Sequence, residues 1–478
     1  MASTRPNVVL ITADDLNWNS VGAFGCKTPD VTPNIDRLAS QGIRFCNGHV
    51  TIAVCQPSRG VLATGRYPHR NGMEGFHHSD VQIPTVMQCL RDGGYTTGIL
   101  GKLGHSTPHA SYRWDMQYDM DELGKGRSPE LYAKYAREFI KKAAQSGKPF
   151  YLMANSHDPH RPFHGSNQEQ NAWPDAVLRP PSRVYAPEEV EVPGFLPDIP
   201  DVRLELAEYF SSVGRCDDTV GAIMAALEEA NCSDNTLVMF LSDNGMAFPF
   251  AKTNCYLHST KTPWIVRWPD KIAPGQVDKR HFISGIDFLP TVMEACGLPP
   301  VPDTDGTSFL PLLLEAKQSG RDCVFTQFHE TAGVKRYPMR CVQNSQFGYI
   351  FNPWSDGERL FRNESQSGRT FEAMRKAAES DVKIAQRVEL FLHRVPEELY
   401  DVQDDPDAQY NLIDNPDYAE VADRMRGKLR DWMKCVNDPA LETLKSDGPN
   451  HGVVAFMADQ EAKAAVRLET RRQKRQNA

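Results

Sequence analysis

Residues 7–15, NVVLITADD, combine a short run of β-branched and aliphatic side chains with two acidic residues that follow it directly. A run of this length without alternating polar residues is typical of a strand buried on both faces. Such strands occur mainly in parallel sheets that helices cover on each side. We therefore expect residues 7–12 to form a buried strand, with Asp14 and Asp15 at its carboxyl end.

Similar apolar runs alternate with helical patterns along the first part of the chain. Further strands are predicted at residues 96–100, 150–155 and 236–242, and helices at residues 33–41, 85–93, 129–144 and 202–230. This alternation favours an α/β fold, with a mostly parallel central sheet and helices on both faces.

The pattern changes after about residue 320. Short strands are predicted at residues 323–328, 339–342 and 348–352, a charged helix at residues 369–392 and a final helix at residues 418–433. We expect a first domain at residues 1–320 and a smaller α+β subdomain at residues 321–478 that completes one side of the cleft.

Two segments have a different composition. Residues 156–200 carry nine prolines, and so long an irregular connection predicts a lid or rim over a site. The basic cluster Arg467–Arg475 lies at the end of the chain. We expect it to be a solvated tail.

Charge and composition exclude several classes of partner. The 478 residues carry a formal net charge of -9, spread along the chain, which argues against a nucleic-acid or membrane surface.

The apolar run at residues 8–11 is too short for a membrane span and lacks the features of a signal peptide. The eleven cysteines include no C-x-x-C pair, which predicts reduced thiols and a cytoplasmic location, with a secretory or periplasmic form trimmed of its signal as the alternative. Whether the chain forms a homo-oligomer is a question that the sequence leaves open.

Two acidic pairs follow predicted strands. Asp14 and Asp15 come after the first strand, and Asp243 and Asn244 come after the strand at residues 236–242. Ligands bind at the carboxyl ends of strands in open α/β sheets, and oxygen ligands suit Ca²⁺ or Mg²⁺. Each pair alone also fits a turn or a helix cap. Together they predict a site for a hard cation.

The segment Cys55-Gln56-Pro57-Ser58-Arg59 places a thiol before a predicted helix at residues 58–63. A helix N-terminus favours an anion, and Arg59 adds a fixed positive charge, so an unmodified Cys55 is predicted to be a reactive thiolate. Hard cations do not select sulfur, so the ligand at position 55 should be an oxygen. The alternative is a buried structural cysteine in a turn.

The pattern Cys55-x-Pro57-Ser58-Arg59 resembles the signature of the sulfatase family, in which the cysteine is oxidised to formylglycine. The resemblance implies an alkaline-phosphatase-like fold with its catalytic domain at residues 1–320. It also implies a formylglycine-generating enzyme during maturation and a sulfated saccharide as substrate. The hydrated aldehyde at position 55 would be the nucleophile.

The resemblance also implies roles for the other site residues. The metal, Ca²⁺ or alternatively Mg²⁺, would be held by Asp14, Asp15, Cys55 (as formylglycine), Asp243 and Asn244. The sulfate group would be held by Arg59, Lys102 and Lys252. His157 would lie beside the leaving group.

Some positions depart from the family pattern or depend on it less. Gly104 stands where the family has a histidine, so His105, one place later, is the expected substitute. Lys252 replaces an arginine of the sulfamidases, which keeps the charge but loses the bidentate fork. His160 and Arg161 are candidates to contact the sugar, with local hydrogen bonding as the alternative.

Within the family, the chain most resembles the sulfamidases, or N-sulfoglucosamine sulfohydrolases, of heparan sulfate breakdown. The matching segments are residues 71–73, 157–161, 192–198, 248–249 with 253–254, 337–340, and 398–401 with 405–406. They extend over nearly the whole chain, and they imply hydrolysis of a sulfamate or a sulfate ester.

Three other functions remain open at this point. One is an O-sulfatase for another sulfated glycan, such as a marine galactan. Another is a phosphonate or phosphate ester hydrolase, against which the cysteine at position 55 argues. The last is a glycan-binding protein with an unmodified Cys55, although a binding protein needs no such complete set of reactive groups.

Overall fold

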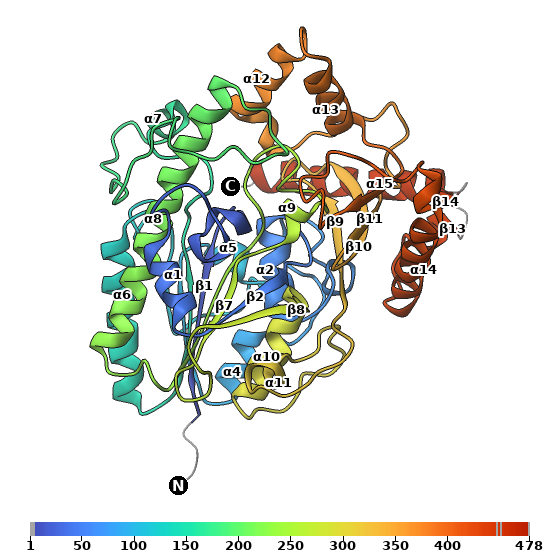
Figure 1. Ribbon diagram of the computed structural model, residues 1–478. Coiled ribbons are helices and arrows are strands. Elements are labelled where there is room, and N and C mark those ends of the chain that lie inside the picture. Colours follow the sequence, from blue (N-terminus) through green and yellow to red (C-terminus); the bar gives the residue numbers. More distant parts are fainter. Residues whose placement is uncertain (1–4, 446–447, 450–451, 477–478) are drawn as a thin grey trace.

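The computed structural model describes residues 5–445, 448–449 and 452–476. Its centre is an eight-stranded sheet, of which β1, β2, β7 and β8 are labelled in Figure 1. The strand order is β4-β3-β5-β1-β6-β7-β2-β8. β1 (Asn7–Ala13) lies between β5 (Phe150–Asn155) and β6 (Thr236–Ser242) and runs parallel to both. The predicted first strand is therefore a central strand of the sheet.

The sheet is parallel on one side of β1 and mixed on the other. β3 (Thr96–Leu100) pairs in parallel with β5 and with β4 (Met116–Tyr118). β7 (Trp264–Arg267) runs antiparallel to both β6 and β2 (Ile43–His49), whereas β2 pairs in parallel with β8 (Gln276–Ser284). The prediction of a mostly parallel sheet is confirmed.

Alternate side chains of β1 enter two separate apolar layers. Val9 and Ile11 pack into one layer, and Val8 and Leu10 into the other. Helices α1 (Pro33–Ser40), α6 (Pro129–Ser146) and α8 (Pro200–Glu229) cover the first face, and α4 (Val86–Asp92), α10 (Phe288–Ala295) and α11 (Leu310–Leu313) cover the second. Because helices cover both faces, the predicted α/β class is confirmed.

A second, four-stranded antiparallel sheet follows, of order β12-β11-β10-β9. Its strands are β9 (Cys323–Glu330), β10 (Arg336–Asn344), β11 (Phe347–Phe351) and β12 (Glu397–Asp401). Helix α14 (Ala419–Cys435) packs against β10 and β11. The smaller α+β part is thus present, and the division at residue 320, in the loop before β9, stays a prediction.

The predicted helix at residues 369–392 is wrong in one respect, because it is two helices. They are α12 (Arg369–Ala377) and α13 (Val382–His393). The side chain of Asp381 accepts hydrogen bonds from the backbone N–H groups of Lys383 and Ile384. Such a cap begins a new helix, which explains the break in the charged stretch.

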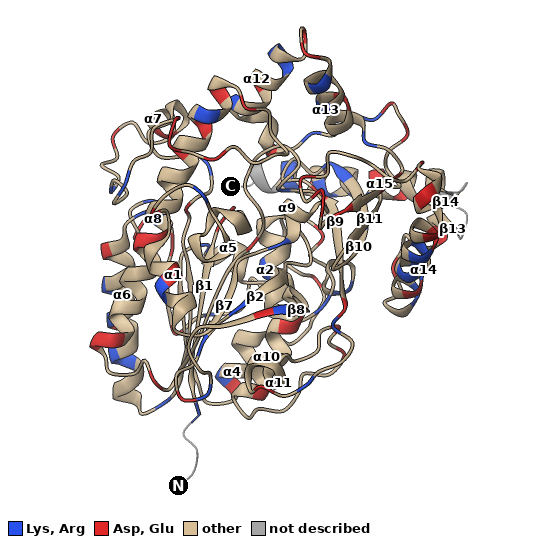
Figure 2. Ribbon diagram, viewed as in Figure 1, with Lys and Arg blue, Asp and Glu red and all other residues tan. Residues whose placement is uncertain are grey.

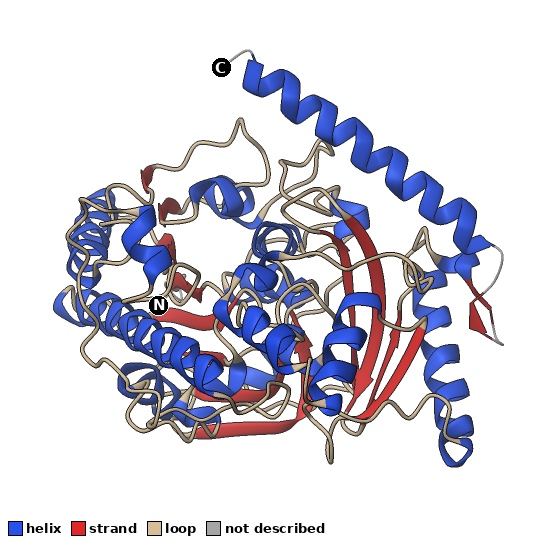
Figure 3. Ribbon diagram, turned by 90° about the horizontal axis from the view of Figure 1, so that it is seen from above, coloured by secondary structure: helices blue, strands red, loops and turns tan. Residues whose placement is uncertain are grey.

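The prediction of a solvated C-terminal tail is also wrong. Residues 452–476 form a long helix, α15 (Gly452–Gln476), along one side of the molecule (Figure 3). Arg467 Nη1 lies 2.8 Å from the buried carboxylate of Glu330, and Arg471 donates to the carbonyl groups of Ala332 and Phe76. These contacts bind basic residues of the last turns to the body of the protein.

The proline-rich segment at residues 156–200 contains one helix, α7 (Asn167–Ala172), and otherwise irregular backbone. Its beginning lies at the carboxyl edge of the sheet, where the N–H of Asp14 donates to the carbonyl of Asp158. Later residues bind to α8, since Arg203 donates to the carbonyl of Val190. The segment thus reaches the sheet edge through its first residues.

The described residues also form several further short α-helices and strands. They are α2 (Cys55–Thr64), α3 (Pro68–Asn71), α5 (Leu103–Ser106), α9 (Leu257–Thr260), β13 (Leu444–Lys445) and β14 (Gly448–Pro449). Within the described ranges, no helix has both the length and the apolar character that crossing a bilayer requires.

Candidate active site

The two acidic pairs meet at the carboxyl ends of β1 and β6. Ala13 pairs with Ser242, so the residues that follow the two strands are neighbours. Carboxylate oxygens of Asp14, Asp15 and Asp243 all lie within 4.8 Å of one another, and the three side chains are buried. The Nδ2 of Asn244 donates to Asp15 over 2.7 Å. The structure thus brings together all four predicted oxygen donors.

This oxygen cluster has the properties of a cation site. Burial, with the charge of Asp14 nearby, raises the pKa of both Asp15 and Asp243 to about 7. The Oδ1 atom of Asn244 is buried and accepts no hydrogen bond from the described residues. A buried, unpartnered amide oxygen, on a residue that contacts a cluster of three carboxylates, suits a hard divalent cation. The donor set therefore fits Ca²⁺ or Mg²⁺.

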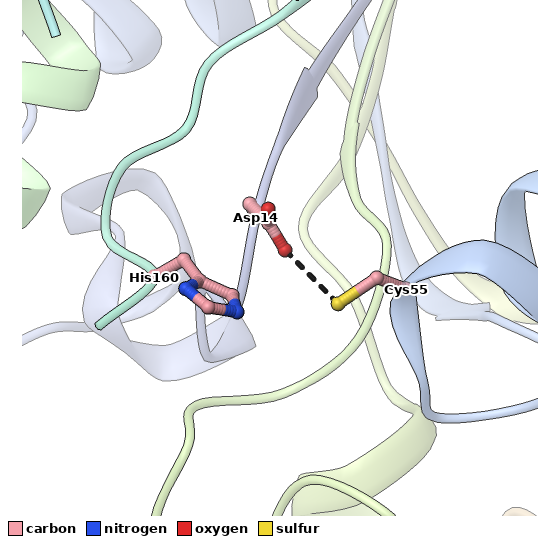
Figure 4. Close-up of side chains that lie close together, drawn as sticks. All are labelled: Asp14, Cys55 and His160. Atoms are coloured by element: carbon pink, nitrogen blue, oxygen red, sulfur yellow. Dashed lines mark hydrogen bonds between the residues drawn. The ribbon is translucent and has the colours of Figure 1, made fainter. Parts of the chain in front are cut away.

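Cys55 is the first residue of α2, so the helix begins three residues earlier than the sequence predicts. Its Sγ lies 3.3 Å from Asp14 Oδ1 and 3.9 Å from Asp15 Oδ1. Figure 4 shows Asp14 at the end of β1, Cys55 at the start of α2 and His160 on a loop, all directed toward one another. Cys55 therefore faces the oxygen cluster.

The electrostatics of Cys55 differ from the sequence prediction. Burial and the charge of Asp14 raise the pKa of the thiol well above its usual value. The thiolate predicted from the helix N-terminus is thus wrong, because the adjacent carboxylates outweigh the helix dipole. A protonated, buried thiol is a poor nucleophile.

Arg59, one turn along α2, is held rigidly at the base of the cluster. Its Nε and Nη2 lie 2.9 Å and 2.8 Å from Asp243 Oδ2. Its Nη1 donates to Thr12 Oγ1 and to Asn155 Oδ1, over 2.8 Å and 2.6 Å. Because the side chain is wholly buried, this charge-assisted network fixes a positive charge beside residue 55.

Two lysines complete the cationic set. Lys102 forms an ion pair with Asp14, and Lys252 Nζ lies 2.7 Å from Asp15 Oδ1. Burial opposes their charge, but the neighbouring carboxylates raise the pKa of Lys102 and hold that of Lys252 well above its usual value. Both lysines are therefore charged at neutral pH. The structure brings all three predicted cations to the oxygen cluster.

The predicted histidines lie around this cluster in neutral form. His157 Nε2 accepts from the N–H of Lys102 over 3.2 Å. The ring of His105, on α5, contacts that of Phe76, with 5.4 Å between centroids. Burial and the charge of Lys102 hold the pKa of His157 well below its usual value and lower that of His105 to about 3.

His160 and Arg161 occupy different surroundings. His160 Nε2 lies 3.9 Å from Asp15 Oδ2, within the cluster. Arg161 instead forms a 2.5 Å ion pair with Glu205 of α8, and its guanidinium lies over the ring of Phe163. The structure thus brings His160, but not the guanidinium of Arg161, to the cluster. Their roles toward a sugar stay predictions.

The backbone at this edge contains several strained residues. Asp15, Lys102 and Thr253 adopt positive φ angles of 68°, 53° and 66°. This left-handed region costs a residue other than glycine about 1 kcal/mol or more, and such residues concentrate at functional sites. The strain aims the side chains of Asp15 and Lys102 at the cluster.

Sequence reasoning missed three residues at the site. Glu364, in the short helix η4 (Glu364–Ser367), forms an ion pair with Lys252. Thr12 and Asn155 bind Arg59 from the ends of β1 and β5. The strand-end rule could have found Thr12 and Asn155. No local signal could have found Glu364, which lies in a short helix far along the chain from Lys252.

Comparisons with known proteins agree with this geometry. Residues 6–298 match the family described as "Sulfatase", and residues 247–355 match "N-sulphoglucosamine sulphohydrolase, C-terminal". The human N-sulphoglucosamine sulphohydrolase is 30% identical, and the match covers 92% of each chain. An "Ulvan-active sulfatase" of Formosa agariphila is 28% identical over 92% of this chain and 82% of its own length.

A solved structure described as a complex with its substrate D-glucosamine-2-N,6-O-disulfate shares the fold. Its TM-score is 0.67 at 17% identity, and the match covers 91% of this chain and 99% of that chain. The family match includes more than half of this chain, and both acidic pairs and Cys55 fall within it. The chain therefore belongs to the sulfatase family, whose members are hydrolases of sulfate esters and sulfamates.

Proposed function

We propose that this chain removes the N-sulfate group of N-sulfoglucosamine units in a heparan-type glycan, with formylglycine at position 55 and a divalent cation. The observation that carries the proposal is the position of Cys55 Sγ, 3.3 Å from Asp14 Oδ1 and 3.9 Å from Asp15 Oδ1, facing the oxygen cluster. The substrate is supported by the 30% identity to the human N-sulphoglucosamine sulphohydrolase over 92% of both chains. The match at residues 247–355 extends that likeness beyond the catalytic motif.

Formylglycine would supply what the thiol of Cys55 lacks. The hydrated aldehyde carries two hydroxyl groups, one to attack sulfur and one to release the sulfate afterwards. A formylglycine-generating enzyme is the partner that this proposal requires. The raised pKa of the Cys55 thiol supports the need for such a conversion.

The cation would be held by Asp14, Asp15, Asp243 and Asn244, with an oxygen of residue 55 as a further ligand. Ca²⁺ is our assignment, and Mg²⁺ is the alternative. When bound, the ion would neutralise negative charge on the nucleophile and on the sulfate oxygens.

Cationic side chains of the chain would bind the sulfate group, and a histidine would protonate the leaving group. Arg59 is fixed by Asp243, Thr12 and Asn155, so it would act as a stationary charge beside the nucleophile. The flexible side chains of Lys102 and Lys252 would turn from their carboxylates to the sulfate oxygens.

A histidine would protonate the departing amine. His157 is held neutral by burial and by Lys102. An anionic sulfate beside it favours the protonated ring, so His157 would take a proton from solvent at Nε2 as the substrate binds and give up the hydrogen bond from the N–H of Lys102. His105 is the alternative donor.

Calcium is expected to stabilise the protein in a pH-dependent way. At about 100 times its Kd, an ion that binds only the folded state raises the Tm of a chain this long by about 3 °C. The pKa values of Asp15 and Asp243 are raised to about 7, so protons compete with the ion below that pH. The rise in Tm should be larger at pH 8 than at pH 6. Thermal unfolding with calcium or with a chelator measures this effect, and an unchanged Tm at both pH values would contradict the assignment.

The substrate assignment predicts a preference for N-sulfate. Aldehyde-bearing enzyme should release sulfate from N-sulfoglucosamine with a kcat/KM about tenfold or more above that for 6-O-sulfated glucosamine. Ion chromatography of released sulfate measures both rates.

An O-sulfatase of a marine glycan is the second candidate, favoured by the 28% identity to the ulvan-active sulfatase. Faster release from an O-sulfated galactan or ulvan oligosaccharide than from N-sulfoglucosamine would replace our assignment with this one.

A further inference from the structure

A pocket of about 270 Å³ opens beside the nucleophile position. Val54, which precedes Cys55, and Thr253, which follows Lys252, form part of its wall. Phe76 forms another part, and its ring contacts that of His105. The pocket is therefore continuous with the surroundings of the site. Its volume suits one small group such as a sugar unit.

The polar lining of this pocket is mainly cationic. Lys335 and Arg362 line it and are exposed, and neither forms an ion pair with any part of the chain that the structure describes. Glu364 is the one acidic residue in the lining, and its carboxylate is paired with Lys252. The two free cations thus give the pocket a net positive charge.

Two walls of the pocket are held in place by the C-terminal helix. Arg471 of α15 donates to the carbonyl of Ala332 over 2.9 Å and to that of Phe76 over 3.0 Å. Both residues line the pocket. Figure 2 shows the basic residues on the last turns of α15. One more cation therefore lies behind the wall, and the pocket has a defined shape.

Asn363 strengthens the connection between pocket and site. Its Nδ2 donates to Thr253 Oγ1 over 2.5 Å, and the next residue, Glu364, is the partner of Lys252. The loop that carries Arg362 is therefore anchored at two points beside the sulfate-binding lysine. A group bound by Arg362 would lie next to the reacting sugar.

We infer that this pocket binds the sugar adjacent to the one that loses its sulfate, and that Lys335 and Arg362 recognise a carboxylate or sulfate group on that second sugar. The inference rests on the proposed function, because it extends the same substrate by one unit. Partly exposed cations give moderate, salt-sensitive attraction to an anion.

The test measures binding to Cys55→Ala protein, which does not turn over. The probes are three disaccharides in which N-sulfoglucosamine is linked to a uronic acid, to a 6-O-sulfated hexose or to a neutral hexose. Isothermal titration should give a Kd about tenfold lower for at least one acidic disaccharide than for the neutral one at low ionic strength. High ionic strength should reduce that ratio.

Variants then show whether the tighter binding of an acidic disaccharide depends on the pocket. Adding Lys335→Ala and Arg362→Ala to the Cys55→Ala protein should bring the ratio of the neutral to the acidic disaccharide's Kd to about one, since contacts with the neutral parts of the sugar are retained. The matched control, Lys279→Ala with Arg280→Ala, removes two exposed cations of β8 outside this pocket and should leave the ratio unchanged.

Equal affinity for all three disaccharides, or a ratio that survives in the pocket variant, would overturn the inference. Hydrolysis of free N-sulfoglucosamine by the aldehyde-bearing enzyme is measured in parallel. That assay tests the proposed function alone, because a single sugar in the active site does not reach the pocket lined by Lys335 and Arg362.

Discussion

Cys55→Ser is expected to abolish repeated turnover while the protein keeps its fold. A serine at this position could attack sulfur, but it would keep the sulfate as an ester and has no second hydroxyl to expel it. We expect kcat to fall by about 10³-fold or more, since removal of a catalytic nucleophile can cost as much as about 10⁶-fold. Steady-state sulfate release measures this loss, and thermal unfolding with calcium shows whether the metal site persists.

The control for this variant is Cys296→Ser, which places serine at another buried cysteine, at the C-terminal end of α10. It should lower the Tm slightly and leave kcat unchanged. Sustained turnover by Cys55→Ser at the parent rate would show that no aldehyde is needed.

Asp243→Asn is expected to have the second largest effect. The change removes one charge from the oxygen cluster and half of the buried ion pair with Arg59, whose Nη2 lies 2.8 Å away. Charge stabilisation by a bound ion is typically worth several kcal/mol in the transition state, so kcat/KM should fall by about 10³-fold. The calcium-dependent rise in Tm should disappear in the same variant.

Asp217→Asn is the matched control, because Asp217 is also a buried aspartate but lies outside the cluster. Its carboxylate accepts hydrogen bonds from the N–H groups of Asn34 and Ile35 at the start of α1. This variant should lose stability and keep both its calcium response and its activity. If Asp243→Asn also keeps its calcium response and its activity, the oxygen cluster is not the metal site.

The sequence predicts the central sheet well, for a physical reason. The strands at residues 96–100, 150–155 and 236–242 agree residue by residue with β3, β5 and β6. Each is a short segment that is buried over almost its whole length, and β5 and β6 are nearly continuous apolar runs. Because site residues follow such strands, the positions of Asp14 and Asp243 are predictable as well.

Tertiary contacts decide what the sequence does not reveal. Residues 452–476 are helical and bound to the body through Arg467 and Glu330, whereas a basic terminal segment by itself predicts a tail. The ion pair of Glu364 with Lys252 joins distant segments. The protonation state of Cys55 depends on Asp14, which only the fold places beside it.

The most direct test of the account is the chemical state of residue 55 compared with activity. Peptide mass spectrometry gives the fraction of chains in which Cys55 has lost its sulfur and gained an aldehyde oxygen, in preparations made with and without a formylglycine-generating enzyme. If formylglycine is the nucleophile, the rate of sulfate release should rise in proportion to that fraction, and no sulfate should be released where the fraction is zero. Full turnover by protein in which every residue 55 is an intact cysteine would contradict this prediction.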